Sequence, residues 1–261
     1  MIGIFDSGIG GLTVVRAVMD QLPGYDIVYF GDTARTPYGN KSSRTVVDYS
    51  LQNTQFLLDQ GAKLVVMACN TASSVATETV NAKFDLPIYE VITPAVNQSL
   101  AMSGKKAIGV IGTRATISSG VYERKIHEKA PDARVYSVPC PLLVPLVEEG
   151  WVKKPETRMI VKKYLHPLKV RQIDTLILGC THYPLLKSII AHKIGKRVSI
   201  IDSSMALAGE IRDFLNEHPE IDRELSQTGN AEFFVSDITP QFEKTACTVL
   251  KQPIALKHVS L

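Results

Sequence analysis

Short runs of apolar, often β-branched residues alternate with longer amphipathic segments along most of the chain. Several of these runs are almost wholly apolar, as expected for strands that helices cover on both faces. The predicted strands are Ile2–Phe5, Asp26–Phe30, Leu64–Ala68, Ile88–Ile92, Ala107–Ile111, Arg134–Val138, Thr175–Leu178, Val198–Ile201 and Glu232–Val235. The predicted helices are Gly11–Gln21, Arg44–Gln60, Ser73–Phe84, Gly120–Lys129, Pro155–Lys169 and Met205–Glu217. The alternation predicts parallel sheets with right-handed crossovers, and therefore an α/β fold.

A faint internal repeat divides the chain into two halves. The segment Ile2–Ser7 is echoed by Ile108–Thr113, and Leu64–Thr71 is echoed more strongly by Thr175–His182. The paired segments are 106 and 111 residues apart, as two related domains with small insertions would give. Each half then has a cysteine just past the carboxyl end of a strand, where ligands of open α/β sheets bind. Two halves that face each other would direct both cysteines into one cleft.

Composition narrows the class of protein. The chain has 261 residues, of which 45% are apolar and 21% charged, so it has enough apolar material to fold as a globular protein. Its formal net charge of +3 is too small to indicate a nucleic-acid or membrane partner. No apolar run reaches the roughly 18 residues of a membrane helix, and the first residues lack the basic region of a signal peptide. Four cysteines are too few for a disulfide scaffold, so we expect a cytoplasmic protein with reduced thiols.

Two turns in the first half offer exposed backbone to a ligand. Asp6–Gly11 is a Gly-rich turn between a predicted strand and a predicted helix, and its N–H groups suit a carboxylate or phosphate. The same turn is also explained by Asp6 acting as a helix cap, and its spacing is not that of a dinucleotide loop or a P-loop. Pro37, Tyr38 and Gly39 form either an ordinary surface turn or a backbone carboxylate site beside a phenol.

The strongest chemical signal is a pair of similar cysteine motifs. Cys69 lies in ACNTAS and Cys180 in GCTHYP, and each follows a small residue and precedes side chains that form hydrogen bonds. We expect both cysteines at helix N-termini, where the helix dipole lowers a thiol pKa. His182 would tune Cys180 or exchange a proton with it. The alternative is that both are buried structural cysteines, which the matched positions in the repeat make less favourable.

The remaining cysteines and histidines do not indicate a metal site. Cys140, Cys247 and the six histidines show neither C-x-x-C nor H-x₃₋₅-H spacing, so zinc is not predicted. A site assembled from distant residues stays open as an alternative. Cys140 lies among prolines and Cys247 in a helix-like tail, and we expect both to be structural.

Two opposed thiols in one cleft have two possible uses. A redox pair must come within about 7 Å between Cα atoms. An acid–base pair is instead held apart by a substrate carbon, so that one thiolate removes a proton from one face and the other thiol delivers a proton to the opposite face. The second arrangement inverts a stereocentre and runs in both directions, and thiols suit it because their pKa is tunable.

At this point the motifs resemble a known family. The chain is similar to the cofactor-independent glutamate racemases of the aspartate/glutamate racemase superfamily through FDSGIGGLTV, PYG, ACNTAS, IGTRATISS, PLVEEG, LGCTHYPLL and IDSS, in that order. These motifs cover almost the entire chain. ACNTAS and LGCTHYPLL together are highly specific, and DSGIGG with PYG favours the glutamate branch over aspartate or hydantoin racemases.

The resemblance implies roles for individual residues. Cys69 and Cys180 would be the two catalytic acid/bases, each serving one enantiomer; Asp6 would assist Cys69, and His182 with Glu148 would assist Cys180. The residues implied to bind the substrate, glutamate, are Asp6, Ser7, Pro37, Tyr38, Gly39, Asn70, Thr71, Thr113, Thr116, Thr181 and His182. No pyridoxal phosphate, other cofactor or metal is implied.

The resemblance also implies an architecture and a context. Two similar parallel-sheet α/β domains related by pseudo-two-fold symmetry would enclose the active site in the cleft between them. We assign residues 1–94 plus 207–261 to the first domain and 95–206 to the second. Members of the family supply D-glutamate for peptidoglycan synthesis and form dimers, so a homodimer is expected, with glutamate as the small-molecule partner.

Two departures from the family pattern are visible. Glu90 occupies a position near the domain crossover where a small residue, usually Gly, is expected. The chain begins at its first strand, without the N-terminal extension with which some members bind a cell-wall-precursor activator, so such activation is not expected. Three alternatives stay open: a racemase of the same superfamily acting on aspartate or another small diacid, an amino-acid-binding protein with two lobes, and a thiol redox protein.

Overall fold

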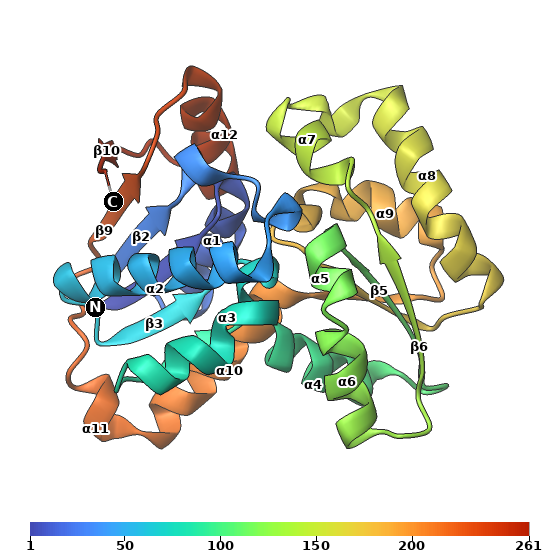
Figure 1. Cartoon of the computed structure of the whole chain (residues 1–261), viewed down its shortest axis with the longest axis horizontal. Helices are drawn as coiled ribbons and strands as arrows, with labels where there is room; N and C mark the ends of the chain where they lie inside the picture. The colour runs from blue at the N-terminus through green and yellow to red at the C-terminus, as the bar shows by residue number, and fades with distance from the viewer. Residues whose placement is uncertain (261) are drawn as a thin grey trace.

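The computed structural model describes residues 1–260 and has two lobes, each built around its own parallel sheet (Figure 1). The first sheet has the strand order β10-β9-β2-β1-β3-β4, and the second has the order β6-β5-β7-β8. The strands are β1 (Ile2–Asp6), β2 (Ile27–Gly31), β3 (Leu64–Met67), β4 (Ile88–Glu90), β5 (Ala107–Gly112), β6 (Arg134–Pro139), β7 (Thr175–Gly179), β8 (Ser199–Asp202), β9 (Ala231–Val235) and β10 (Leu256–His258). Every strand pair is parallel, which confirms the predicted α/β class.

Helices cover both faces of each sheet. They are α1 (Leu12–Gln21), α2 (Ser43–Asp59), α3 (Asn70–Lys83), α4 (Ile92–Met102), α5 (Arg114–Ser118), α6 (Val121–Lys129), α7 (Leu143–Glu148), α8 (Pro155–Val170), α9 (Lys187–Ile194), α10 (Ser203–Glu217), α11 (Pro219–Asp222) and α12 (Pro240–Leu250). Short 3₁₀ helices span Ile9–Gly11, Thr33–Arg35, Tyr38–Asn40, Trp151–Lys153 and Tyr183–Leu186. Within residues 1–260, none of the helices combines the length and the apolar character that spanning a bilayer requires.

The internal repeat is reproduced in the strand register. In the first sheet Ile2 of β1 pairs with Leu64 of β3, and in the second sheet Ile108 of β5 pairs with Thr175 of β7. These are the residues that the two sequence echoes align. The neighbouring strands follow the same order in both sheets, because β2-β1-β3-β4 corresponds to β6-β5-β7-β8. The repeat therefore describes two lobes of the same topology.

Successive side chains of a strand point to opposite faces of the first sheet, and each face packs against its own apolar core. Ile2 and Ile4 of β1 belong to the apolar cluster that includes α1, α10 and α12, whereas Phe5 belongs to the cluster under α2 and α3. The first of these clusters continues into the second lobe through α4, where it includes Ile108 and Val110 of β5. This continuous core joins the two lobes on the side of the crossovers.

The chain crosses between the lobes twice. After β8 it returns through α10 to the first lobe, where β9, α12 and β10 follow, so that the N-terminus and the C-terminal segment lie in the same lobe (Figure 1). β9 pairs with β2, and β10 extends the edge of the sheet. The strand β10 was not predicted, because its three residues, Leu-Lys-His, contain no apolar run.

Three predicted boundaries were wrong by two or more residues, each because a helix begins early; the helix predicted from Met205, for example, starts at Ser203. The strand predicted to reach Ile92 ends at Glu90, whose carboxylate accepts hydrogen bonds from the backbone N–H groups of Ile92 and Thr93 and so caps α4. The helix predicted from Ser73 starts at Asn70, directly after Cys69. The unexpected residue Glu90 thus begins the first helix of the crossover, where Lys125 of α6 lies 3.8 Å from its carboxylate.

Candidate active site

A small cavity lies between the lobes at the carboxyl ends of β1, β3, β5 and β7. Its volume is about 20 Å³, and it is lined by Ser7, Thr36, Pro37, Tyr38, Gly39, Cys69, Asn70, Thr71, Thr113, Val144, Cys180, Thr181 and His182. Eleven of these thirteen residues belong to the set that the sequence analysis selected. The other three selected residues, Asp6, Glu148 and Thr116, stand behind the lining and form hydrogen bonds with it. Thr36 and Val144 were not predicted.

Cys69 lies at the N-terminus of α3, as expected, but its surroundings do not lower its pKa. The side chain is buried, and its sulfur lies 3.7 Å from Ser7 Oγ. Burial, reinforced by the negative charge of Asp6, raises the pKa of the thiol to about 12. The expectation from the helix dipole was therefore wrong here, because removal from water outweighs the dipole. At neutral pH Cys69 carries its proton in this structure.

Cys180 belongs to a chain of contacts with a histidine and a carboxylate. Its sulfur lies 3.8 Å from His182 Nδ1, and His182 Nε2 lies 3.1 Å from Glu148 Oε1. Burial lowers the pKa of His182, but its hydrogen bonds to Cys180 and Glu148 outweigh burial and raise the pKa to about 10. His182 is therefore an imidazolium at neutral pH. The predicted helix N-terminus is absent at Cys180, because a 3₁₀ turn separates it from α9.

Asp6 organises the Gly-rich turn and bridges the lobes. Its Oδ2 accepts hydrogen bonds from the N–H groups of Gly8 and Gly11, and its Oδ1 accepts one from Thr181 Oγ1 at 3.2 Å. The carboxylate is fully buried, and this burial raises its pKa. The structure thus supports Asp6 as the cap of this turn, because its own carboxylate takes up the N–H groups of Gly8 and Gly11 that were expected to be open to a ligand. Within residues 1–260, no hydrogen bond joins Asp6 directly to Cys69.

The phenol of Tyr38 is engaged by the protein rather than free for a ligand. It donates to Asp32 Oδ2 and accepts from Asn53 Nδ2 at 3.0 Å. The fully buried Asp32 also pairs with Arg35, whose Nε lies 2.7 Å from Oδ2. The turn over Pro37–Gly39 can therefore offer its backbone to a ligand, while the phenol fixes its position. Asp32 was not predicted, because its burial beside Tyr38 and Ser236 follows only from how this loop folds against the end of β9.

Near Cys69, hydroxyl and amide groups of the first lobe form hydrogen bonds with groups of the second lobe. Thr71 Oγ1 lies 3.0 Å from Thr113 Oγ1 and 3.3 Å from Thr116 Oγ1, which joins α3 of the first lobe to the start of α5 in the second. Asn70 Oδ1 accepts a hydrogen bond from Tyr122 of the second lobe. These contacts connect the lobes directly beside Cys69.

Two polar groups of the cavity have no partner. Among the described residues, Asn70 Nδ2 and Thr36 Oγ1 are buried without a hydrogen bond, and only Thr175 Oγ1 shares this property elsewhere. Because buried polar groups are almost always paired, such atoms in a cavity point to a polar ligand. The cavity offers a ligand one free N–H₂ group and one free hydroxyl in addition to its thiols.

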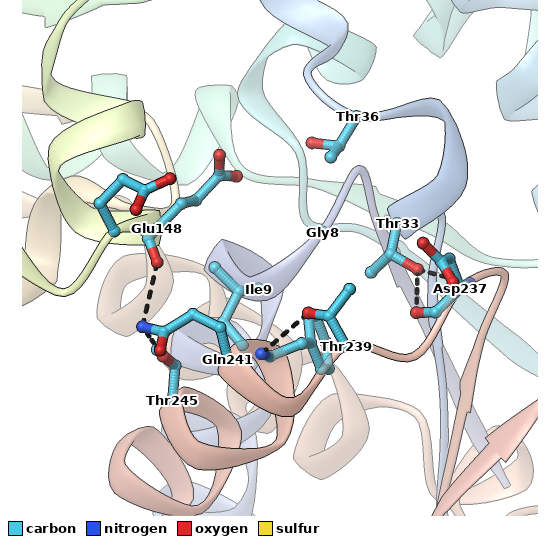
Figure 2. A pocket seen from close by; sticks show the side chains of 11 residues that line it. Gly8, Ile9, Thr33, Thr36, Glu148, Asp237, Thr239, Gln241 and Thr245 are labelled. Atoms are coloured by element: carbon cyan, nitrogen blue, oxygen red, sulfur yellow. Dashed lines mark hydrogen bonds between the residues drawn. The ribbon is translucent and has the colours of Figure 1, made fainter.

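A larger cavity of about 250 Å³ adjoins the first and contains neither cysteine (Figure 2). Thr36 lines both cavities. Figure 2 shows Gln241 of α12 donating a hydrogen bond to the backbone oxygen of Glu148 across this space, at 3.2 Å. The larger cavity thus lies between the C-terminal segment of the first lobe and α7 of the second, next to the cysteines rather than around them.

The other cysteines lie outside the cavity. Cys140 is buried in the core of the second lobe and Cys247 is half-buried on α12, while all four thiols are free. Within the described part of the chain, no three or more His, Cys, Asp or Glu side chains are grouped so as to hold a metal ion.

Comparisons with known proteins agree with this geometry. The model of the Asp/Glu/hydantoin racemase family matches residues 13–211. A glutamate racemase from Persephonella marina is 47% identical over 100% of this chain and 97% of its own length. The crystal structure of a glutamate racemase isoform from Bacillus anthracis has a TM-score of 0.94 and 38% identity, and covers 100% of this chain and 97% of its own. A glutamate racemase from Francisella tularensis, solved in complex with D-glutamate, has a TM-score of 0.90 and 39% identity over 99% of this chain and 97% of its own. The chain therefore belongs to the Asp/Glu/hydantoin racemase family of amino-acid racemases.

Proposed function

We propose that this chain interconverts L-glutamate and D-glutamate by proton transfer at the α-carbon between two cysteines, Cys69 and Cys180. The observation that carries this proposal is that two cysteines from matched strand ends of two similar lobes line one cavity. The names of the most similar relatives support glutamate as the substrate, since each is a glutamate racemase.

The surroundings of the two thiols differ, and this difference suits a two-base reaction. The high pKa of Cys69 makes it a proton donor, whereas the imidazolium of His182 stabilises negative charge on the Cys180 sulfur. In one direction Cys180 acts as the base and removes the α-proton from one face of the substrate, and the Cys69 thiol delivers its proton to the opposite face. The C–H bond broken at one face is replaced by a C–H bond at the other, and the charge ends on Cys69. The reverse reaction starts from the opposite protonation state.

The cavity must also stabilise the charge that develops when the α-proton leaves. Hydrogen bonds to the α-carboxylate stabilise negative charge on its oxygens. The unpaired Nδ2 of Asn70 and the hydroxyls of Thr71, Thr113 and Thr116 lie beside Cys69 and are the donors that we assign to this carboxylate. Asp6 and Ser7, together with Thr181, are assigned to the ammonium group, and the turn of Pro37, Tyr38 and Gly39 to the side-chain carboxylate.

The lobes must separate to admit the substrate. A cavity of about 20 Å³ is of the size that holds one water molecule, so it is too small for glutamate. We propose that the lobes 1–94 plus 207–261 and 95–206 move as domains about the two crossovers, whose boundaries fall inside α4 and α10. Closure would then expel water from the reacting groups.

The wider context follows from the resemblance to cofactor-independent glutamate racemases. We propose that the chain works in the cytoplasm as a homodimer and that it supplies D-glutamate for peptidoglycan synthesis. The alternative substrate is aspartate, because the family model covers aspartate racemases as well.

The proposal is tested by incubating the purified chain with L-glutamate in D₂O without added cofactor. Loss of circular dichroism together with deuterium at the α-position is the expected result. Loss of signal with L-aspartate but not with L-glutamate would keep the mechanism and change the substrate. Tight binding of glutamate without deuterium exchange would contradict the enzyme and favour a binding protein.

A further inference from the structure

Among residues 1–260, Thr36 lines both cavities and carries a hydroxyl without a partner. Its Oγ1 is buried and forms no hydrogen bond with any described residue. No sequence motif singles out Thr36, and the proposed proton transfer does not involve it. A buried hydroxyl without a partner is costly, so its presence in a cavity calls for a ligand group that it can bind.

The loop that carries Thr36 is held firmly in place. Arg35 is paired with the buried Asp32, and Thr33 Oγ1 both donates to the backbone oxygen of Asp237 and accepts from its N–H. Ser236 Oγ accepts from the N–H of Ala34 and donates to Asp32. The unpaired hydroxyl is therefore presented by a rigid segment, and a rigid donor loses little entropy when it binds a ligand.

The position of Thr36 indicates which part of a substrate it meets. Its Oγ1 lies over the Gly-rich turn, since a methyl group built on Gly8 would lie 3.3 Å from it. It borders the larger cavity, which contains neither thiol, whereas Asn70, the other unpaired group, follows Cys69 directly. A substrate whose α-carbon lies between the thiols and whose α-carboxylate meets Asn70 directs its far end toward Thr36.

On the basis of the proposed function, we propose that Thr36 binds substrate directly: its hydroxyl donates a hydrogen bond to the side-chain carboxylate of glutamate. This assigns to Thr36 the discrimination between an amino diacid and an amino acid of similar size with an apolar end. A site built to hydrogen-bond a group rejects analogues that lack it, because the donor is then left unpaired.

The test replaces the hydroxyl by a methyl group of the same shape, in the variant Thr36→Val. The Kd for D-glutamate, measured by calorimetry, is expected to rise about tenfold or more, the loss typical of a hydrogen bond to a charged group. The KM for glutamate is expected to rise with it while kcat changes little, because the lost contact is made equally in the ground state and the transition state. Thr36→Ser keeps the hydroxyl and is expected to restore most of the affinity.

Two controls separate this contact from a general effect on the fold. Thr175→Val removes the other buried unpaired hydroxyl, which lies in β7 outside the cavity, and is expected to leave the Kd unchanged. For 2-aminobutyrate, which lacks the side-chain carboxylate, Thr36→Val is expected to bind no more weakly than the parent chain. Unchanged glutamate affinity in Thr36→Val, with racemisation intact, would overturn the role of Thr36 alone. Loss of affinity in Thr36→Val, in a parent chain that binds glutamate without racemising it, would support Thr36 and overturn the proposed function.

Discussion

Gly10 and His182 come from different lobes and approach so closely that only a hydrogen atom fits between them. A methyl group on Gly10 would lie 2.5 Å from His182 Nδ1 and 2.3 Å from Thr181 Oγ1. His182 Nδ1 is also the atom that faces the Cys180 sulfur. The Gly-rich turn therefore does more than cap a helix, since its backbone forms one wall of the space that holds His182 in position.

Replacing Gly10 by Ala is therefore expected to damage catalysis rather than folding. The methyl group must push His182 and Thr181 away, and a displacement of about 1 Å near reacting groups lowers rates on the order of a hundredfold. The measurement is kcat/KM with both enantiomers of glutamate. Gly104→Ala is the matched control, because a methyl group at Gly104 meets nothing within 4 Å. Equal activity of the two variants would show that the close approach of Gly10 has no role in the reaction.

The two cysteines are expected to be indispensable, each for one face of the substrate. Cys69→Ala and Cys180→Ala should each lower racemisation by about a thousandfold or more, the loss typical of removing a general acid–base group. The serine variants should keep slow α-proton exchange with one enantiomer each, and not with the same one. Cys247→Ser, which changes a half-buried cysteine on α12, should retain full activity. Undiminished racemisation by Cys69→Ser would rule out the two-base scheme.

Asp32 is expected to be a major contributor to stability. It is fully buried and binds Arg35, Tyr38 and Ser236, so its removal leaves buried donors without an acceptor. Asp32→Ala should lower the free energy of unfolding by about 2–3 kcal/mol, measured by urea denaturation. Asp132→Asn, which breaks an exposed pair with Lys106, should change it by less than about 0.5 kcal/mol. Similar losses in both variants would contradict the importance of the buried network.

Stability should fall in acid partly through Asp26, which fastens β2 to the loop before β9. Burial raises its pKa, but hydrogen bonds from Asn230, Ser226 and Thr228 outweigh burial and lower the pKa to about 2. An unfolded chain has the ordinary value of 3.8, so it binds a proton more readily than the folded chain. The stabilisation that the Asp26 carboxylate contributes is therefore complete above about pH 4 and is lost as the pH falls toward 2.

The check is the urea midpoint of Asp26→Asn and of the parent chain between pH 7 and pH 2.5. The parent chain should lose more stability on acidification than the variant, because the variant has no carboxylate to protonate at this position. Asp48→Asn, at an exposed position of α2, should follow the parent chain. A parent chain and Asp26→Asn variant with parallel acid profiles would refute the assignment.

The sequence by itself determined the parallel α/β fold and the repeat, because these depend on local patterns, while most of the cavity lining was implied by the resemblance to a known family. Strand and helix periodicities are properties of neighbouring residues, and the echo between Leu64–Thr71 and Thr175–His182 aligned the same residues that the sheets pair. Both cysteines were found in this way, since each follows the end of a short apolar run.

The tertiary structure decided the chemical state of these groups. The dipole of a helix was expected to lower the pKa of Cys69, yet burial beside Asp6 raises it. Tyr38 turns its phenol toward Asp32, and Thr36 is left as a buried hydroxyl without a partner. These properties depend on which side chains the fold brings together and on how completely water is excluded. A pattern of neighbouring residues contains neither, because the energies of burial and pairing are fixed only when the chain folds.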